Sequence, residues 1–275
     1  MLKADYHMHT SLCDGKNTPE EMAEAAIDLG LKHMGFSGHF DPENGVHMET
    51  EEYLKEIKRI KEKYKDRIDI LLGGEIDCLY PNPEIEKELE YVIGSTHSVY
   101  YKGNVIPVDD TEEKLDNGCN EYFGGDYLRL AKEYYRTEAE IVDKIKPDFI
   151  GHFDLITRFN DSMHFLDESN PAYINSALET MEFLVKKDIP FEINCGAYNR
   201  SRKKDLYPNI RLLKALFEFG GRIIINSDAH ETGKITGGFE KAVENAIACG
   251  FKYTGILISN GNSGVEWKEL ALHEL

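Results

Sequence analysis

Two histidines separated by one residue lie near the start of the chain, at the end of the segment 4–10. If this segment is a β-strand, the alternation of side chains places His7 and His9 on one face and Met8 on the other. At the end of a barrel strand that shared face is the interior, where two imidazole nitrogens can hold one divalent metal ion. A structural pair is the alternative, because the chain contains ten histidines.

Short apolar segments alternate with helix-like segments along the rest of the chain. Predicted strands lie at 33–38, 68–76, 91–97, 149–152, 191–194 and 222–226. Capping residues and apolar stripes predict helices at 18–29, 50–65, 126–145, 170–187, 210–219 and 238–249. This alternation predicts right-handed β-α-β units and a parallel sheet, which seven units would close into a barrel of one α/β domain over residues 1–275.

In a parallel barrel the C-terminal ends of the strands converge on one mouth, where such folds build their sites. Eight polar side chains are predicted to meet there: His7, His9, His39, Glu75, His97, His152, Asp228 and His230. Burying them together is costly unless cations bind them, and the set exceeds what one tetrahedral ion can use. Asp14 is close enough in sequence to join as a ligand, although residues 13–17 are also typical of a plain turn.

Taken in order, these residues resemble the PHP (polymerase and histidinol phosphatase) family, and within it the monofunctional histidinol-phosphatases. The motifs are His7-x-His9, His39 after an apolar strand, Gly74-Glu75, Ser95-Thr96-His97, Gly151-His152-Phe153-Asp154 and Ser227-Asp228-Ala229-His230. They extend over nearly the whole chain. The resemblance implies a distorted (β/α)7 TIM-like barrel that holds three divalent metal ions, which are Zn, Mn or Fe.

The resemblance also implies how the ligands are shared among the ions. The first ion would be held by His7, His9, Glu75 and Asp228. Glu75 would bridge to a second ion, held by His97 and His152. The third ion would be surrounded by Asp14, His39 and His230.

Two arginines extend the resemblance to the substrate. Arg158 follows the fifth predicted strand and Arg200 the sixth, and both resemble positions that grip substrate phosphate, a task suited to the planar guanidinium fork. Arg202 is close enough to be confused with Arg200. Cys195 stands where the family often has a hydroxyl residue, which leaves the contribution of this segment to substrate recognition open.

The predicted activity is metal-dependent hydrolysis of L-histidinol phosphate to L-histidinol and phosphate, in histidine biosynthesis. The sequence contains no Cys-x5-Arg loop, nucleophile elbow or Walker-type loop, so metal-activated water is the expected nucleophile. A hydroxide bridging two ions would attack phosphorus in line with the ester oxygen. Glu75, His39 and His230 are the predicted catalytic residues, and His39, His230 or the third ion would stabilise or protonate the leaving alkoxide.

Charge and composition limit the partners. The net charge of -18 argues against long nucleic acids and anionic membranes, while bound cations would still admit a small phosphate monoester. Five scattered cysteines favour free thiols and a cytoplasmic location, and no apolar run reaches the length of a membrane span. The segment 102–125 is predicted to be a long loop, either a lid or a contact in a homo-oligomer.

Other interpretations remain open. A PHP-type nucleotide phosphoesterase or nuclease would share the metal set and differ in its loops. The amidohydrolases also begin with His-x-His, but they usually have a fourth-strand lysine and lack the Gly-Glu and Asp-x-His placements found here. A non-catalytic metal-binding protein would close its coordination sphere, whereas a catalytic site keeps a position open for water.

Overall fold

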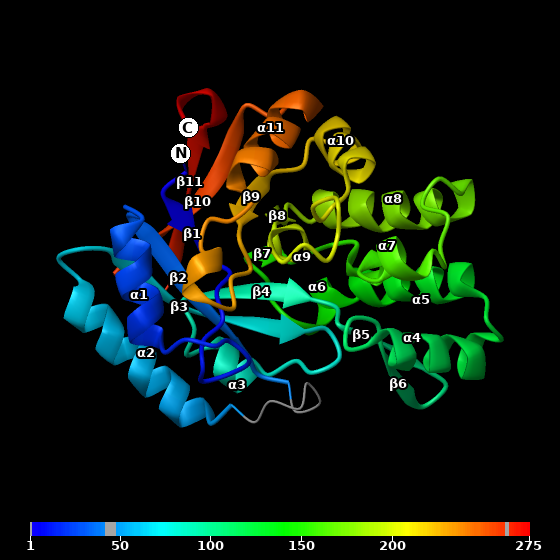
Figure 1. The fold of residues 1–275 in the computed structure, drawn as a ribbon, viewed down its shortest axis with the longest axis horizontal. Helices are drawn as coiled ribbons and strands as arrows, with labels where there is room; N and C mark the ends of the chain where they lie inside the picture. The colour runs from blue at the N-terminus through cyan, green and yellow to red at the C-terminus, as the bar shows by residue number, and fades with distance from the viewer. Residues whose placement is uncertain (1, 42–47, 262–263) are drawn as a thin grey trace.

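The computed structural model describes residues 2–41, 48–261 and 264–275. Its centre is a nine-stranded sheet of order β1-β2-β3-β4-β7-β8-β9-β10-β11 (Figure 1). The barrel strands are parallel to one another: β1 (Ala4–Asp5), β2 (His33–His39), β3 (Asp69–Asp77), β4 (Tyr91–Ser95), β7 (Phe149–Ile150), β8 (Phe191–Asn194) and β9 (Ile223–Asn226). β10 (Tyr253–Ser259) is parallel to β9, and β11 (Val265–Ala271) is antiparallel to β10.

The ring of strands is closed by residues that follow β1, which itself has only two residues. Met8 forms a parallel bridge with Ala229. The His9 N–H donates to the carbonyl oxygen of Ala229 at 2.9 Å, and the Ala229 N–H donates to that of His7 at 3.1 Å. β10 pairs with β9 at Ile224, near the start of β9. The contacts of Ala229 with the first strand lie beyond the other end of β9, toward the mouth of the barrel. This arrangement confirms the predicted distorted (β/α)7 barrel.

Helices cover the outside of the ring. α1 (Pro19–Asp28) begins with the predicted capping box, in which Thr18 Oγ1 accepts from the Glu21 N–H and the Glu21 carboxylate accepts from the Thr18 N–H. The other long helices are α2 (Thr50–Tyr64), α5 (Tyr127–Ala139), α8 (Pro171–Lys186), α10 (Ile210–Glu218) and α11 (Phe239–Cys249). The short ones are α3 (Pro83–Glu86), α6 (Ile141–Lys144), α7 (Asn160–Met163) and α9 (Gly196–Asn199), with 3-10 turns at Leu155–Thr157, Thr232–Lys234 and Leu272–Glu274.

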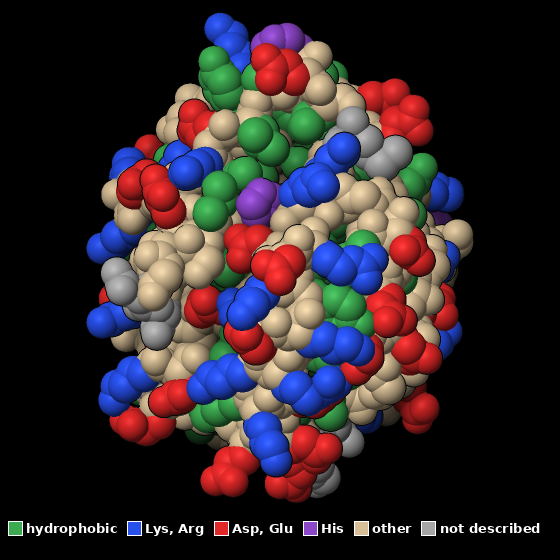
Figure 2. Space-filling view, turned by 90° about the vertical axis from the view of Figure 1, so that its left-hand side faces the viewer, with side chains coloured by type: hydrophobic (Ala, Val, Ile, Leu, Met, Phe, Trp, Pro, Cys, Tyr) green, Lys and Arg blue, Asp and Glu red, His purple; other side chains and the backbone are tan. Residues whose placement is uncertain are grey.

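The face that carries α1 and α2 exposes both basic and acidic side chains (Figure 2). Arg59 of α2 donates to Glu20 of α1 at 2.6 Å and to Glu56 at 2.7 Å, and Lys63 also pairs with Glu20. Lysine and arginine side chains therefore alternate with carboxylates over this face. Among the described residues, no helix is both long enough and apolar enough to cross a membrane.

The side chain of Tyr91 lies inside the barrel, and its position accounts for the glycines at positions 35 and 73. The Tyr91 hydroxyl donates to the backbone carbonyl oxygens of Tyr6 and Phe36, on the first and second strands. A Cβ atom at Gly35 would lie 2.3 Å from the Tyr91 hydroxyl oxygen, and one at Gly73 would lie 2.1 Å from its ring. Only glycine leaves room for the Tyr91 ring at these two positions.

The segment 102–125 is not the predicted long loop. With the residues before it, it forms a hairpin followed by two helices: β5 (Ser98–Tyr101), β6 (Asn104–Pro107), α4 (Glu112–Gly118) and a π-helix (Cys119–Phe123). Leu115, Cys119 and Phe123 recur at four-residue intervals and are buried, so a helical period is present. The prediction was wrong because the neighbouring glycine, asparagine and aspartate residues hide that period.

Candidate metal centre

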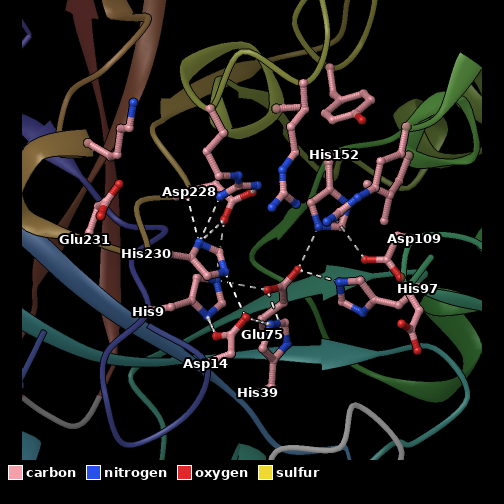
Figure 3. Close-up of a pocket in the computed structure, with 18 of the residues that line it drawn as sticks. His9, Asp14, His39, Glu75, His97, Asp109, His152, Asp228, His230 and Glu231 are labelled. Atoms are coloured by element: carbon pink, nitrogen blue, oxygen red, sulfur yellow. Dashed lines mark hydrogen bonds and ion pairs between the residues drawn. The ribbon is translucent and has the colours of Figure 1, made fainter. Parts of the chain in front are cut away.

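The strand ends bring the predicted polar residues to one mouth (Figure 3). They surround a cavity of about 420 Å³, whose lining includes His9, Asp14, His39, Glu75, His97, His152, Asp228 and His230. His39 is the last residue of β2 and Glu75 lies within β3, whereas the others follow their strands. His7 lies beneath the cavity and is fully buried.

The first group of side chains surrounds one oxygen of Glu75. Glu75 Oε2 lies 3.0 Å from His7 Nε2 and 3.4 Å from His9 Nε2. Asp228 Oδ1 approaches the same two nitrogens, at 3.9 Å from His7 and 3.6 Å from His9. His9 Nε2 is buried and has no hydrogen-bond partner among the described residues. Nitrogen and carboxylate atoms gathered in this way suit a divalent cation.

The second oxygen of Glu75 faces a different pair of imidazoles. Glu75 Oε1 lies 2.8 Å from His152 Nε2 and 3.1 Å from His97 Nε2, and it accepts a hydrogen bond from Ser95 Oγ at 2.7 Å. Glu75 therefore lies between two groups of nitrogen atoms, with one oxygen toward each. That is the geometry a bridging carboxylate requires.

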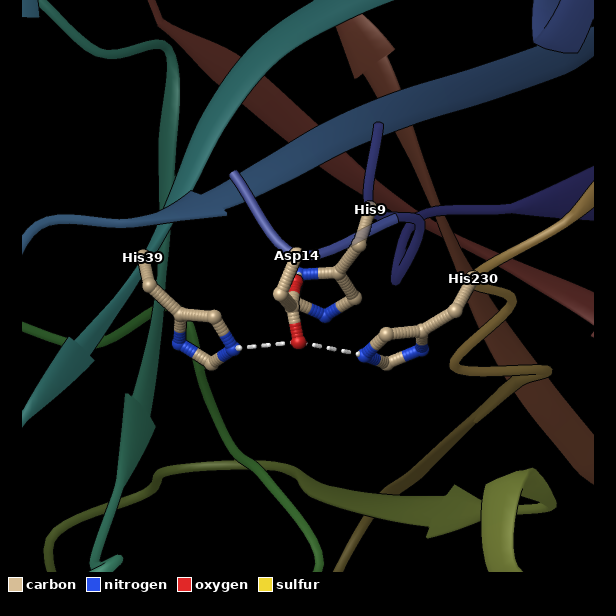
Figure 4. Close-up of side chains that lie close together, drawn as sticks. All are labelled: His9, Asp14, His39 and His230. Atoms are coloured by element: carbon tan, nitrogen blue, oxygen red, sulfur yellow. Dashed lines mark hydrogen bonds and ion pairs between the residues drawn. The ribbon is translucent and has the colours of Figure 1, made fainter. Parts of the chain in front are cut away.

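Asp14 is the centre of a third group (Figure 4). Asp14 Oδ2 lies 2.9 Å from His230 Nε2 and 3.8 Å from His39 Nε2, and Asp14 Oδ1 lies 3.2 Å from His9 Nδ1. The loop that carries Asp14 turns back because the N–H groups of Cys13 and Gly15 both donate to the carbonyl oxygen of Thr10. The turn and the proximity to the histidines, which the sequence left as alternatives, are thus present together.

The protonation states of these groups suit metal binding. Burial lowers the pKa of His9 to about 4, with help from the neighbouring His230, so its imidazole is neutral at pH 7. Burial opposes the negative charge of Glu75, but the adjacent His7 and His39 bring its pKa well below the ordinary value. For His7, burial is outweighed by carboxylates, chiefly Glu192, which raise its pKa well above the ordinary value. Neutral imidazoles and ionised carboxylates bind metal, and an ion at this point would replace the proton on His7.

The model of the PHP domain matches residues 5–196, more than half of the chain. This chain belongs to the PHP family. A protein of Deinococcus radiodurans named a probable histidinol-phosphatase is 30% identical over 248 residues, which are 87% of this chain and 91% of the relative. A Schizosaccharomyces pombe protein of the same name is 28% identical over 255 residues, 84% of this chain and 81% of the relative.

The PHP fold is also shared with a solved structure. The crystal structure of histidinol phosphate phosphatase from Lactococcus lactis, complexed with Zn, L-histidinol and phosphate, superposes with a TM-score of 0.74. It is 22% identical to this PHP protein and covers 97% of this chain and 100% of its own. At this identity the likeness concerns the fold.

Buried carboxylates that were not predicted from the sequence contact the histidines of the PHP centre. Glu192 Oε1 accepts from His7 Nδ1 at 2.8 Å. Asp77 Oδ2 accepts from the backbone N–H of His97 at 2.6 Å and lies 3.3 Å from His97 Nδ1. Such partners fix the orientation of a ligating imidazole. The available signal was a carboxylate within an apolar strand at Glu192 in β8, and one at the end of an apolar strand at Asp77 in β3.

The arginines lie on one side of the PHP cavity. Arg200 donates to the Asp228 carbonyl oxygen at 2.8 Å and to Asp228 Oδ2 at 3.2 Å. Arg158 Nη1 lies 3.5 Å from Asp109 Oδ2. Arg202 lines the same cavity, so the structure brings together all three arginines that the sequence singled out. Cys195 is fully buried, so its side chain is part of the core.

Proposed function

We propose that this PHP protein is a metal-dependent phosphomonoesterase that hydrolyses L-histidinol phosphate to L-histidinol and phosphate. The observation that carries the proposal is one cavity at which histidines and carboxylates, clustered closely enough to hold metal ions, lie beside a set of arginines. A metal centre next to guanidinium groups suits a phosphate ester. The histidinol-phosphatase names of the two relatives support this choice of substrate.

The proposed ligands divide among three divalent ions of Zn, Mn or Fe. The first would be held by His7, His9, Glu75 and Asp228, the second by Glu75, His97 and His152, and the third by Asp14, His39 and His230. Support comes from the two oxygens of Glu75, each facing its own group of nitrogens, and from the unpartnered buried His9 Nε2. When bound, divalent ions lower the pKa of water and neutralise phosphate oxygens.

The side chains of this protein would bind the phosphate and move a proton. Arg158 and Arg200 are proposed to grip the phosphate oxygens. His39 and His230, which lie on either side of Asp14, are the candidates for giving a proton to the leaving alkoxide. No serine, threonine or cysteine lines the cavity in the described part of the chain, which favours water as the nucleophile.

A PHP-type nucleotide phosphoesterase or nuclease is the alternative. The net charge of -18 and the mixed charges of the face in Figure 2 disfavour long nucleic acids. A mononucleotide would still fit the same chemistry. The free thiols of all five cysteines support a reducing cytoplasm as the location.

The test is metal analysis of the purified protein combined with a panel of phosphate monoesters. We expect L-histidinol phosphate to be hydrolysed with a higher kcat/KM than mononucleotides. Chelation should abolish turnover, and Mn or Zn should restore it. Full activity in metal-stripped protein would exclude the mechanism, and preference for a nucleotide would favour the alternative.

Two variants separate the proposed roles. His7→Ala should lose metal and turnover together while the fold remains, because His7 contacts Glu75 and not the arginine side of the cavity. Arg158→Ala should raise KM at unchanged metal content. Metal stoichiometry and steady-state kinetics check both, and loss of metal in Arg158→Ala would contradict this division.

A further inference from the structure

Three hydrogen-bond donors of residues that line the cavity have no acceptor among the described residues. They are Arg158 Nε, Arg200 Nε and the hydroxyl of Tyr207, which are buried and without a hydrogen-bond partner among the described residues. All three residues line the cavity, and Tyr207 is only 2% exposed. Leaving a buried donor unpaired is costly, so three of them around one cavity indicate a missing acceptor with several oxygens.

Tyr207 is held firmly in this position. Its N–H donates to the Asn194 carbonyl oxygen at 3.1 Å, and its own carbonyl oxygen accepts from the Asn194 N–H at 2.7 Å. This bridge joins it to the last residue of β8, at the mouth of the barrel. Lys203 Nζ lies 5.7 Å from the ring centroid and is paired with Glu168 at 3.7 Å. The backbone of Tyr207 is therefore fixed at the mouth of the barrel, where the residue lines the cavity.

We propose that Tyr207 is a substrate-binding residue whose hydroxyl donates a hydrogen bond to a non-bridging oxygen of the phosphate held by Arg158 and Arg200. This assignment rests on the proposed function. A phosphate monoester has three such oxygens, which match three donor groups better than the two oxygens of a carboxylate. A neutral hydroxyl donates in this way without adding charge between two guanidinium groups.

The experiment measures binding of inorganic phosphate to the full-length, metal-loaded protein by calorimetry. In Tyr207→Phe we expect phosphate affinity to fall roughly tenfold, the loss expected for one hydrogen bond to a charged group. KM for histidinol phosphate should rise by a similar factor, with kcat and metal content little changed. Phosphate affinity equal to that of the wild type would overturn the proposal.

The matched control is Tyr173→Phe. It removes another buried hydroxyl, which pairs with Tyr135 at 2.8 Å away from the cavity lining, so phosphate affinity should stay unchanged. A crystal structure of the wild type with phosphate tests the contact without a substitution. We expect Tyr207 Oη within about 3 Å of a phosphate oxygen. A hydroxyl bonded only to protein atoms or water would overturn the assignment.

These measurements separate the two proposals. If the wild type binds phosphate but does not hydrolyse histidinol phosphate, the proposed function fails while the role of Tyr207 is still decided by phosphate affinity. If turnover is found and Tyr207→Phe binds phosphate normally, only the role of Tyr207 fails. A metal-loaded wild type that does not bind phosphate overturns the Tyr207 assignment as well.

Discussion

Glu192 accepts hydrogen bonds from four donors. Oε1 accepts from His7 Nδ1 at 2.8 Å and from Asn226 Nδ2 at 2.9 Å. Oε2 accepts from the His152 N–H at 3.0 Å and from Asn194 Nδ2 at 2.9 Å. One carboxylate thus contacts two proposed metal ligands that follow different strands, because both of its oxygens are acceptors.

Glu192→Gln should weaken metal binding. A glutamine turns one acceptor atom into a donor, so either His7 or His152 loses its partner, and loss of such a contact typically costs about 10–100-fold in metal affinity. Metal content at buffered free-ion concentrations measures the effect. Glu182→Gln is the control, because Glu182 is an exposed residue of α8 paired with Lys186. Equal metal content in wild type and Glu192→Gln would contradict the role.

At the scale of elements, one carboxylate fixes β4 against β7. Asp148 precedes β7, its N–H donates to the Val92 carbonyl oxygen at 2.8 Å, and its Oδ2 accepts from the Val92 N–H at 2.7 Å. Burial raises the pKa of Asp148 to about 6, against an ordinary value of 3.8. Between about pH 4 and pH 6, Asp148 is therefore protonated in the folded protein and ionised in the unfolded chain.

A group whose pKa is raised by folding stabilises the protein fully below its unfolded pKa, and this contribution is lost as pH rises through the folded pKa. For Asp148 the loss falls between about pH 4 and pH 6 and amounts to at most about 3 kcal/mol. Asp148→Asn keeps an acceptor for the Val92 N–H and cannot ionise. Urea denaturation should show that the free energy of unfolding of Asp148→Asn, relative to that of the wild type, increases from pH 4 to pH 7. Asp143→Asn, an exposed position on α6, should show no such trend.

The segment between β6 and α4 brings a negative charge to the arginine side of the mouth. Asp109 Oδ2 lies 3.5 Å from Arg158 Nη1, and both side chains are largely buried. In the proposed complex this carboxylate competes with phosphate for the same guanidinium. Inorganic phosphate should bind Asp109→Asn about two- to fivefold more tightly, as expected for a weak ion pair. Calorimetry measures this, with exposed Glu113→Gln on α4 as control, and weaker binding would show that Asp109 supports the anion site.

Strand ends could be predicted from sequence, while the supporting network could not. His39 and His97 follow apolar runs, so their meeting at one mouth required only the β-α-β rule. Glu192 could be noticed as a carboxylate in an apolar strand, but three of its four donors lie on other segments of the chain and could not be predicted. Tyr207 carries no local signal, because only the fold brings it to the cavity. The segment 102–125 was misjudged because its buried apolar residues are spaced among turn-forming ones.

For the whole molecule, we expect the clustering of imidazoles and carboxylates at one mouth to make the free energy of unfolding depend on bound ions. An ion at 100 times its dissociation constant stabilises the folded state by about 2.7 kcal/mol. Chelation should therefore lower the melting temperature by roughly 5–10 °C. Scanning calorimetry checks this against chelator preloaded with excess metal. An unchanged melting temperature after verified metal removal would contradict it.

The bridge between Met8 and Ala229 joins residues at opposite ends of the barrel sequence, so we expect it to form late in folding. Contacts of such long sequence separation tend to form slowly. Glu75 lies within β3, and His97 and His152 follow the neighbouring strands β4 and β7, so these three residues can meet before the ring closes. The groups around Asp228 and Asp14 need closure, because they combine the first and last barrel strands. Refolding in the presence of metal should accordingly take up ions in two kinetic phases, the slower one reporting closure of the barrel.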